Sequence, residues 1–484
     1  MFPSLSRVTY RATDWSSRKK VIAAGAILGV VAIACGSSSG ALSNPPATST
    51  DTAPTSTPAA IETPVPAPTT ATTTIEAPAP TTTPAPIQAP AHTPAPDAEP
   101  KAVAVEIPAQ PEDEGPLVER RKLELWEESI ERRATLLGWK IDFELRTISL
   151  DELLISLRRD GIQPIDDPTF ESVQDAAPRL AKKEPVIVLE IDDDARAYPL
   201  SILVNHEIVN DEVGGTPVAV TFCPLCNSSI AFDRRVDGIV HRFGTSGMLR
   251  KSDLVMWDDR TETRWQQLTG EAIVGEQAGK QLTFLPVQIS TFEEFAASHP
   301  DGVVLNPPRN TPYLRASYQG YDDNVQDPFL FSGEIDRRLP ATARVTALNL
   351  GSGPVAYSFE LLADHHALNV ASGGLPIVIF FDDTTQSVFR SIEPGRLGEI
   401  NISGSSTTYL REIDDMVLTF VSNGNGTFTD EQTGSIWDRF GEALSGEFAG
   451  RELDPIIHGD HFWFAWAAFE PDTELITDIS QLQS

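Results

Sequence analysis

Short runs of β-branched and aromatic residues, each bounded by Gly, Pro or Asp, recur along the chain after residue 178. Such runs are typical of β-strands, and they lie at 186–191, 216–222, 229–233, 239–243, 376–381 and 416–421. Helical periodicity is limited to a charged segment at 119–137 and to short segments at 292–298 and 463–469. The pattern predicts a mainly β (α+β) fold with a few short helices.

The same pattern occurs twice, because one half of the body can be laid over the other in order along a long stretch. His206 falls on His365 and, after a change in loop length, Trp265 falls on Trp437. A repeat period this long makes each copy a domain-sized unit rather than a solenoid repeat. We therefore expect two tandemly duplicated β-rich lobes in which these pairs of residues superpose.

The duplication and the changes in composition divide the chain into six segments. They are a lipoprotein signal at 1–35, a disordered linker at 36–115, a leading helical segment at 116–178, a first lobe at 179–302, a connector at 303–334 and a second lobe at 335–475. The part after residue 115 is long enough for two hydrophobic cores or one double core.

The first 35 residues read as an export signal. Basic residues precede an apolar stretch at 21–34, which has the length of a signal-peptide core and is short for a transmembrane helix. The stretch ends in Ala32-Ile33-Ala34-Cys35, which resembles a bacterial lipobox in which Cys35 is lipidated. The alternative is an uncleaved signal anchor. Either alternative places residues 36–484 on the extracytoplasmic face of the bacterial cell membrane, where the environment is oxidising. In the lipobox alternative, a lipid anchor holds the protein at the membrane.

The composition of the linker and the net charge narrow the class of protein further. Residues 36–115 are mainly Pro, Thr, Ala and Ser, and such a tract cannot bury enough surface to offset chain entropy, so we expect it to be extended and disordered. The formal net charge of −32 argues against a nucleic-acid partner and against electrostatic attachment to anionic lipid. The membrane, reached through the lipid anchor, is the partner that the sequence indicates.

Cys223 and Cys226 are the only cysteines besides Cys35, and they lie between two predicted strands. Two thiols at Cys-x-x-Cys spacing can close a small disulfide ring or chelate one metal ion. The second copy has 382–385 (Asp-Asp-Thr-Thr) in their place. A disulfide that the fold needs for stability would be expected in both copies. A disulfide that closes so small a ring also removes little conformational entropy from the unfolded chain. The asymmetry therefore favours a chemical role.

A strand-turn-strand knuckle of this kind resembles half of a zinc-ribbon site, and a complete metal site needs further ligands. His206, His458 and His461 are the candidates, with His206 the first choice, although a histidine kept in both copies also suits a structural hydrogen bond. Thiolates favour a soft metal such as copper.

Three hypotheses stay open, besides a hydrolytic enzyme, which has less support because the carboxylates are not patterned as an acid/base pair. The first is soft-metal binding by Cys223, Cys226 and His206. The second is thiol–disulfide redox catalysis by the two cysteines. The third is a non-catalytic binding or scaffold protein whose cysteine pair is an oxidised turn.

Several longer motifs, taken in order, resemble a known bacterial family. They are Ala-Tyr-Pro-Leu at 197–200, His-Glu-Ile-Val-Asn-Asp at 206–211, Gly-Gly-Thr-Pro-Val-Ala-Val-Thr-Phe-Cys-Pro-Leu-Cys-Asn at 214–227, Phe-Gly-Thr-Ser-Gly-Met-Leu at 243–249 and Phe-Trp-Phe-Ala-Trp-Ala-Ala-Phe at 462–469.

With these motifs the chain is similar, over about residues 155–475, to the family called domain of unknown function 3179. Asp253 stands where that family commonly has Asn, and Thr263 stands where it commonly has Ser. The resemblance implies that Cys223 and Cys226 are important and supports the limits of the lobes. It supplies no substrate.

Overall fold

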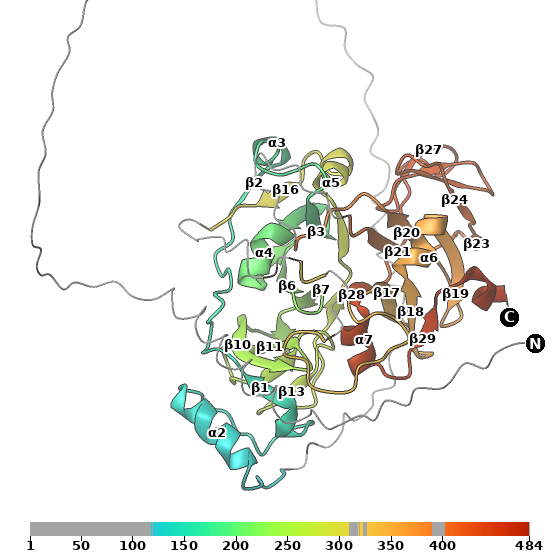
Figure 1. The fold of residues 1–484 in the computed structure, drawn as a ribbon. Helices are drawn as coiled ribbons and strands as arrows, with labels where there is room; N and C mark the ends of the chain where they lie inside the picture. Colours follow the sequence, from blue (N-terminus) through green and yellow to red (C-terminus); the bar gives the residue numbers. More distant parts are fainter. Residues whose placement is uncertain are drawn as a thin grey trace, which may run out of the picture. The chain divides into compact units, whose positions relative to one another are not determined.

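The computed structural model describes residues 118, 120–308, 318, 320–322, 327–389 and 402–483. The predicted signal at 1–35, its Cys35 and the predicted linker at 36–115 lie outside the described residues. Within the described part of the chain, no helix is long and apolar enough to cross a membrane. Figure 1 shows many short strands with a few short helices, and the prediction of a mainly β fold is confirmed.

The first half of the body contains three sheets and one separate hairpin. The sheets have the strand orders β15-β3-β4-β16-β2, β14-β7-β6-β5 and β1-β10-β11-β12-β13. Their strands are β1 (Leu153–Ile155), β2 (Phe170–Ser172), β3 (Pro185–Ile191), β4 (Asp194–Pro199), β5 (Ile208–Val213), β6 (Thr216–Cys223), β7 (Ser228–Asp233), β10 (Phe243–Arg250), β11 (Asp253–Asp258), β12 (Arg264–Gln266), β13 (Ala272–Val274), β14 (Phe284–Leu285), β15 (Gln288–Thr291) and β16 (Val303–Leu305), and the hairpin is β8 (Arg235–Val236) with β9 (Ile239–Val240).

The second half repeats this plan. Its sheets have the strand orders β28-β17-β18-β29, β19-β20-β21 and β24-β25-β26-β27. The strands are β17 (Arg344–Asn349), β18 (Pro354–Ser358), β19 (Ala367–Ser372), β20 (Leu375–Asp382), β21 (Ser405–Leu410), β24 (Phe420–Ser422), β25 (Phe428–Asp430), β26 (Ile436–Trp437), β27 (Ala443–Ser445), β28 (Gly459–Phe462) and β29 (Glu474–Ile476), and the separate hairpin is β22 (Glu412–Ile413) with β23 (Met416–Val417).

The described helices are few and short. They are α2 (Glu127–Leu136), α3 (Val173–Ala176), α4 (Leu200–His206), α5 (Phe292–Ser298), α6 (Phe359–His365) and α7 (Trp463–Phe469), with the 3-10 turns η1 (Leu150–Glu152) and η2 (Ile479–Gln483). The two short helices predicted at 292–298 and 463–469 are confirmed as α5 and α7. The helix predicted at 119–137 is shorter, because it begins only at Glu127. The predicted leading segment also supplies strands β1 and β2 to the first half.

The two halves have matching connections. In the first, the hairpin β3–β4 leads through α4 to β5, β6 and β7, and β16 joins β4 in parallel. In the second, the hairpin β17–β18 leads through α6 to β19, β20 and β21, and β29 joins β18 in parallel. His206 and His365 end the equivalent helices α4 and α6. Each helix is followed by a residue with φ near 60°, Glu207 at 59° and His366 at 56°.

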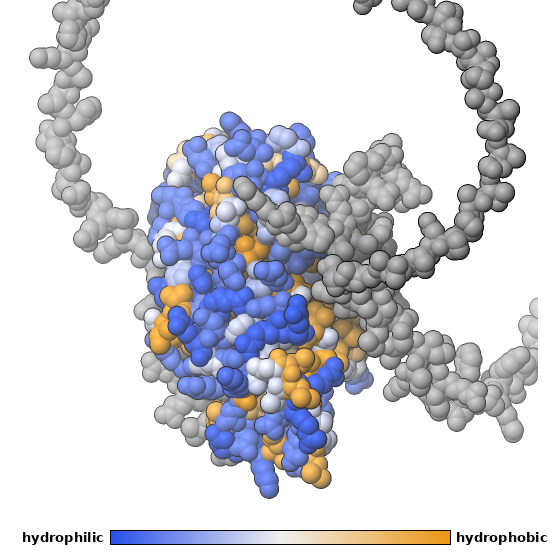
Figure 2. Space-filling view, turned by 90° about the vertical axis from the view of Figure 1, so that its left-hand side faces the viewer, coloured by the Kyte–Doolittle hydropathy of each residue, from blue (hydrophilic) through white to orange (hydrophobic). Residues whose placement is uncertain are grey.

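The largest hydrophobic core joins the two halves. It contains strands β5, β6 and β7 of the first half together with Ala341, Val345 and residues 462–467 of the second. Helix α7 is buried on most sides and contributes three fully or nearly fully buried residues, Trp463, Phe464 and Ala465. Cys223 and Cys226 belong to this core, so the candidate site lies inside the protein and not on its surface. Figure 2 shows that the visible face is largely hydrophilic with scattered hydrophobic patches.

Candidate functional site

Cys223 and Cys226 lie in the tight turn between β6 and β7, where the strand register pairs Cys223 with Ser228. The amide of Cys226 donates a hydrogen bond of 3.2 Å to the carbonyl oxygen of Cys223. Asn227 has a φ of 52°, a left-handed conformation that Asn adopts more readily than most residues. The two sulfur atoms are 3.9 Å apart, and both cysteines are free and buried.

A second hairpin turn, between β10 and β11, brings Asp253 to the cysteines. Its two loop residues, Lys251 and Ser252, have φ values of 51° and 67°, as in the primed turns that usually contain Asn and Gly. Ser252 is fully buried, and its carbonyl oxygen accepts a hydrogen bond from Sγ of Cys226 over 3.5 Å. Non-glycine residues in this conformation cost backbone energy, and such strain is concentrated at functional sites. The turn is held by this contact and by hydrogen bonds from Ser252 Oγ to the carbonyl oxygen of Phe329 and from Lys251 Nζ to that of Ala468.

Asp253 completes a buried group of three acidic side chains. One ligand atom from each of Cys223, Cys226 and Asp253 lies within 4.8 Å of the others. Oδ2 of Asp253 accepts hydrogen bonds from Nε2 of Gln266 over 2.5 Å and from the amide of Leu268 over 3.0 Å. Oδ1 has no hydrogen-bond partner among the described residues. One oxygen is thus fixed by Gln266 and Leu268, and the carboxylate lies close enough to Cys226 and Cys223 for their thiols to lower its pKa by hydrogen bonding.

Glu207 is a fourth buried acidic residue beside this group. It follows α4, and its carbonyl oxygen accepts a hydrogen bond of 2.8 Å from the amide of Phe222, the neighbour of Cys223. Burial, followed by the charge of Asp253, raises the pKa of Glu207 to about 8. Burial also raises the pKa of Asp253 to about 6, against hydrogen bonds from Gln266 and Leu268 that lower it.

The same burial keeps the two thiols protonated. It raises the pKa of Cys223, and the charges of Asp253 and Glu207 add to this effect. It raises the pKa of Cys226 well above its usual value, and the hydrogen bond with Cys223 adds to this. A thiolate is the reactive form of cysteine, so neither sulfur is activated as a nucleophile in this structure.

Aromatic residues from separate parts of the chain pack around the cysteine turn. Tyr318, Tyr321, Phe389 and Phe462 form a chain of ring contacts with centroid separations of 5.8–6.4 Å. The amide of Phe462 donates a hydrogen bond of 2.9 Å to the carbonyl oxygen of Cys226. Because Phe462 belongs to the second half, both halves enclose the site and lower its dielectric constant.

His206 does not belong to the three-residue group. Its Nδ1 lies 2.7 Å from the carbonyl oxygen of Gln163, and its Nε2 is buried without a hydrogen-bond partner among the described residues. The contact with Gln163 is the structural hydrogen bond considered as the alternative for this histidine. Asp253 therefore stands where a histidine ligand was expected.

The other two candidate histidines are also absent from the group. The ring nitrogens of His458 lie 2.9 Å and 3.3 Å from the carbonyl oxygens of Ile456 and Ser406. His461 is stacked on Trp466 with a centroid separation of 5.5 Å, and burial lowers its pKa to about 3. The contacts that position both histidines are therefore made with residues of the second half.

The equivalent turn of the second half carries hydroxyl groups in place of sulfur. Asp382 ends β20, and its two carboxylate oxygens each accept a hydrogen bond of 2.6 Å, one from Thr384 and one from Thr385. The hydroxyl of Thr385 also lies 2.7 Å from that of Ser405. This turn satisfies its own polar groups, whereas the cysteine turn leaves Oδ1 of Asp253 without a hydrogen-bond partner among the described residues.

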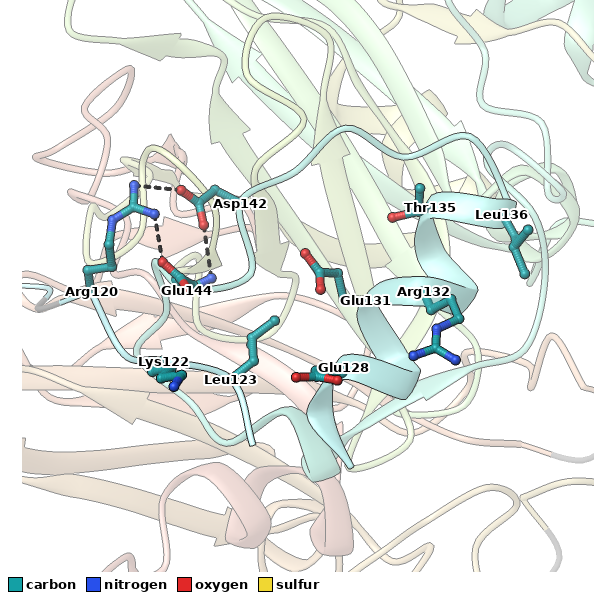
Figure 3. A pocket seen from close by; sticks show the side chains of 10 residues that line it. All are labelled: Arg120, Lys122, Leu123, Glu128, Glu131, Arg132, Thr135, Leu136, Asp142 and Glu144. Carbon is teal, nitrogen blue, oxygen red and sulfur yellow. Dashed lines mark hydrogen bonds and ion pairs between the residues drawn. The ribbon is translucent and has the colours of Figure 1, made fainter. Parts of the chain in front are cut away.

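A larger hollow, of about 720 Å³, lies beside α2 in a different part of the fold (Figure 3). Arg120 forms ion pairs there with Asp142 at 2.7 Å and with Glu144 at 2.8 Å. Figure 3 shows Glu128, Glu131 and Arg132 projecting from the helix along the same hollow. Its charges are of both signs, and Arg120 is paired with two of the carboxylates, so this hollow shows no cluster of thiols and carboxylates like that at the cysteine turn.

Asp253 and Glu207 were not identified as site residues from the sequence. The family motifs could have drawn attention to both residues. Glu207 directly follows His206 in one of the motifs, and Asp253 stands where the family commonly has Asn. Neither signal shows that the residue lies beside the cysteines, since that depends on how separate hairpins pack.

The chain was compared with curated proteins and with solved structures, and none of either matches it. One family, described as "Protein of unknown function (DUF3179)", matches residues 159–473. The match includes the cysteine turn, Glu207, Asp253 and both halves of the fold, and the chain therefore belongs to this family.

Proposed function

We propose that this protein binds a thiophilic divalent metal ion, with Zn(II) as the best fit, through Cys223, Cys226 and Asp253. The observation that carries the proposal is the meeting of these three buried acidic groups, with ligand atoms all within 4.8 Å of one another. A buried carboxylate oxygen without a hydrogen bond is costly. A cation bound at this point would satisfy that oxygen and stabilise both thiolates.

The spacing of the sulfur atoms supports this function. In a tetrahedral site with metal–sulfur bonds of about 2.3 Å, two sulfur ligands are about 3.8 Å apart. The sulfur atoms of Cys223 and Cys226 are 3.9 Å apart. This spacing is compatible with two sulfur ligands of one tetrahedral ion.

The kind of donor atoms favours Zn(II) over copper. Copper(I), the soft metal expected from the thiols alone, prefers sulfur donors such as Cys and Met, whereas carboxylates suit harder ions. Zinc accepts both thiolate and carboxylate ligands. The carboxylate of Asp253 therefore shifts the preference of the site towards Zn(II).

Thiol–disulfide exchange is the less favoured alternative. Redox-active cysteines are partly exposed and have a lowered pKa. Here Cys223 and Cys226 are 1% and 0% exposed, and burial raises the pKa of both thiols. The scaffold alternative needs an oxidised turn, and its support is weakened because the two cysteines are free in the structure.

We place this site on a lipid-anchored protein outside the cytoplasm. The support is the basic and apolar sequence at 1–35 that ends at Cys35, and the Pro- and Thr-rich composition of 36–115. Exported free thiols tend to be oxidised. A bound metal ion would hold Cys223 and Cys226 in the reduced form in that environment.

Metal analysis of the full chain, isolated from membranes under conditions that avoid added metal, tests the function. We expect one zinc ion per chain, lost in Cys223→Ser and Cys226→Ser. Thr385→Ser, in the equivalent turn of the second half, is the matched control and should keep its zinc. A wild-type protein that takes up no Zn(II) when titrated in the reduced state would rule out the metal function.

A further inference from the structure

Two adjacent glutamines at the end of β12 contact both of the hairpins that form the proposed site. Gln266 and Gln267 are fully buried. Nε2 of Gln266 donates over 2.5 Å to Oδ2 of Asp253, and Oε1 of Gln266 has no hydrogen-bond partner among the described residues. The amide group of Gln266 thus acts only as a donor, and the shorter of its two hydrogen bonds goes to the carboxylate of Asp253.

Gln267 holds the strands on either side of the cysteine turn. Its Nε2 donates to Oγ1 of Thr221 over 2.9 Å and to the carbonyl oxygen of Ser228 over 3.2 Å, and its Oε1 accepts from the hydroxyl of Ser228 over 2.5 Å. Thr221 lies in β6, two residues before Cys223, and Ser228 begins β7, where it pairs with Cys223. One side chain therefore ties together both ends of the turn that carries the thiols.

The main chain joins the contacts of the two glutamines into one unit. The amide of Gln267 donates over 3.0 Å to the carbonyl oxygen of Leu254, which directly follows Asp253 in β11. The amide of Leu268 donates over 3.0 Å to Oδ2 of Asp253. Residues 266–268 are joined by planar peptide bonds of fixed length. This short segment therefore connects the carboxylate of Asp253 to the strands that carry the thiols.

We propose that Gln266 and Gln267 are positioning residues, which keep the carboxylate of Asp253 at the distance from the thiols that one metal ion requires. The inference rests on the metal-binding function proposed above and deepens it. Groups that hydrogen-bond to metal ligands orient those ligands and raise metal affinity. Ligands on separate hairpins need such support, because a site must be held to within about 0.5 Å of its productive geometry.

The second half has a different residue in the place of Gln267. It is Arg439, two positions after the tryptophan of that half. Its Nη1 and Nη2 each lie 3.1 Å from the hydroxyl oxygen of Ser405, and Ser405 pairs with Asp382 in the equivalent turn. A guanidinium suits a turn that carries a carboxylate, whereas its charge would disfavour a cation held beside it. The neutral amide therefore occurs in the copy that has the thiols.

Zinc affinity of the reduced full chain, with cobalt(II) as a spectroscopic substitute, tests this role. Gln267→Leu removes the hydrogen bonds to Thr221 and Ser228 with little change in side-chain size. We expect zinc affinity to fall at least tenfold, as is typical when groups that support metal ligands are lost. The cobalt spectrum of the folded variant should also lose intensity in the bands of tetrahedral, thiolate-bound cobalt. Ser228→Ala, which removes only one of these hydrogen bonds, is the milder second variant and should change affinity in the same direction.

A loss of stability alone would not produce these changes. Asp430→Asn removes a hydrogen-bonding carboxylate from the second half and serves as the matched control. It should unfold more easily than wild type, but once folded it should keep the zinc affinity and the cobalt spectrum of wild type.

The effect of Gln267 must depend on Asp253 if Gln267 acts by placing that carboxylate. In an Asp253→Asn background we therefore expect Gln267→Leu to cost much less zinc affinity than it does in wild type. An equal loss in both backgrounds would overturn the inference. So would a Gln267→Leu protein that binds zinc within about twofold of wild type with an unchanged cobalt spectrum, and the three-ligand site would then stand. If wild type itself binds neither ion, the proposed function fails first.

Discussion

Trp265 and Trp437 make the same hydrogen bond in the two halves of the protein. Each indole Nε1 donates over 2.9 Å to Oδ2 of an aspartate seven residues earlier, Asp258 in the first half and Asp430 in the second. Both tryptophans are fully buried. The expectation that they occupy equivalent positions thus agrees with their surroundings, and the cysteine turn stands out as a difference between otherwise similar halves.

The shared aspartates predict matching losses of stability. Asp258 and Asp430 each accept hydrogen bonds from a threonine hydroxyl as well as from the indole. An asparagine amide group cannot accept from all these donors, so a buried donor would be left unpaired. We expect Asp258→Asn and Asp430→Asn each to lower the free energy of unfolding by about 1–3 kcal/mol, measured by denaturation followed by tryptophan fluorescence. Asp193→Asn, at an exposed turn, should have little effect, and a loss in one half alone would contradict the equivalence.

Asp253 predicts the metal preference of the site. Asp253→Asn removes the charged donor but leaves an oxygen that can still accept from Gln266 and Leu268, so the fold should persist. We expect zinc affinity, measured by competition with a chelating indicator, to fall at least tenfold, as typical for disturbed metal ligation. The preference should shift towards copper(I), because the two sulfur donors then dominate. Equal zinc affinity in the variant and wild type would remove Asp253 from the site.

The burial of the two thiols predicts slow chemical modification. Cys223 and Cys226 are inaccessible and protonated in the folded protein, and thiol reagents attack the exposed thiolate. Mass spectrometry of labelled peptides should show both cysteines reacting at least tenfold more slowly in the folded metal-free protein than in denaturant. Bound zinc should slow the reaction further. Rapid labelling of either cysteine in the folded protein would instead favour the redox alternative.

The sequence was sufficient for local structure and insufficient for the complete site. The β-branched runs, the short helices and the turn carrying Cys223 and Cys226 could be predicted because each depends on residues close together in the chain. Asp253 could not, because it reaches the thiols from the β10–β11 hairpin, which is separate from the turn that carries them. His206 was the preferred third ligand on its residue type, but its Nδ1 contacts the carbonyl oxygen of Gln163. The direction of a side chain at a helix end depends on packing that spacing does not specify.

His461 predicts how stability depends on pH on the acid side. Burial, together with a smaller effect of the nearby His458, lowers its pKa to about 3 from the 6.5 of an ordinary histidine. As the pH falls below 6.5, His461 therefore becomes protonated in the unfolded chain but stays neutral in the folded protein. The stabilising contribution of neutral His461 is complete above that pH and is lost progressively as the pH falls towards 3, by at most about 1.4 kcal/mol per pH unit.

His461→Phe isolates this contribution, because it keeps an aromatic ring against Trp466 and removes the titrating nitrogens. We expect the variant and wild type to differ little in their pH dependence above pH 7, and the variant to lose less stability between pH 6.5 and 4. Titrating groups that do not interact with His461 are present in both proteins and cancel in the comparison. His365→Gln, at an exposed position, serves as the control and should follow wild type. Parallel curves for wild type and His461→Phe in the acid range would mean that His461 is protonated as readily in the folded protein as in the unfolded chain.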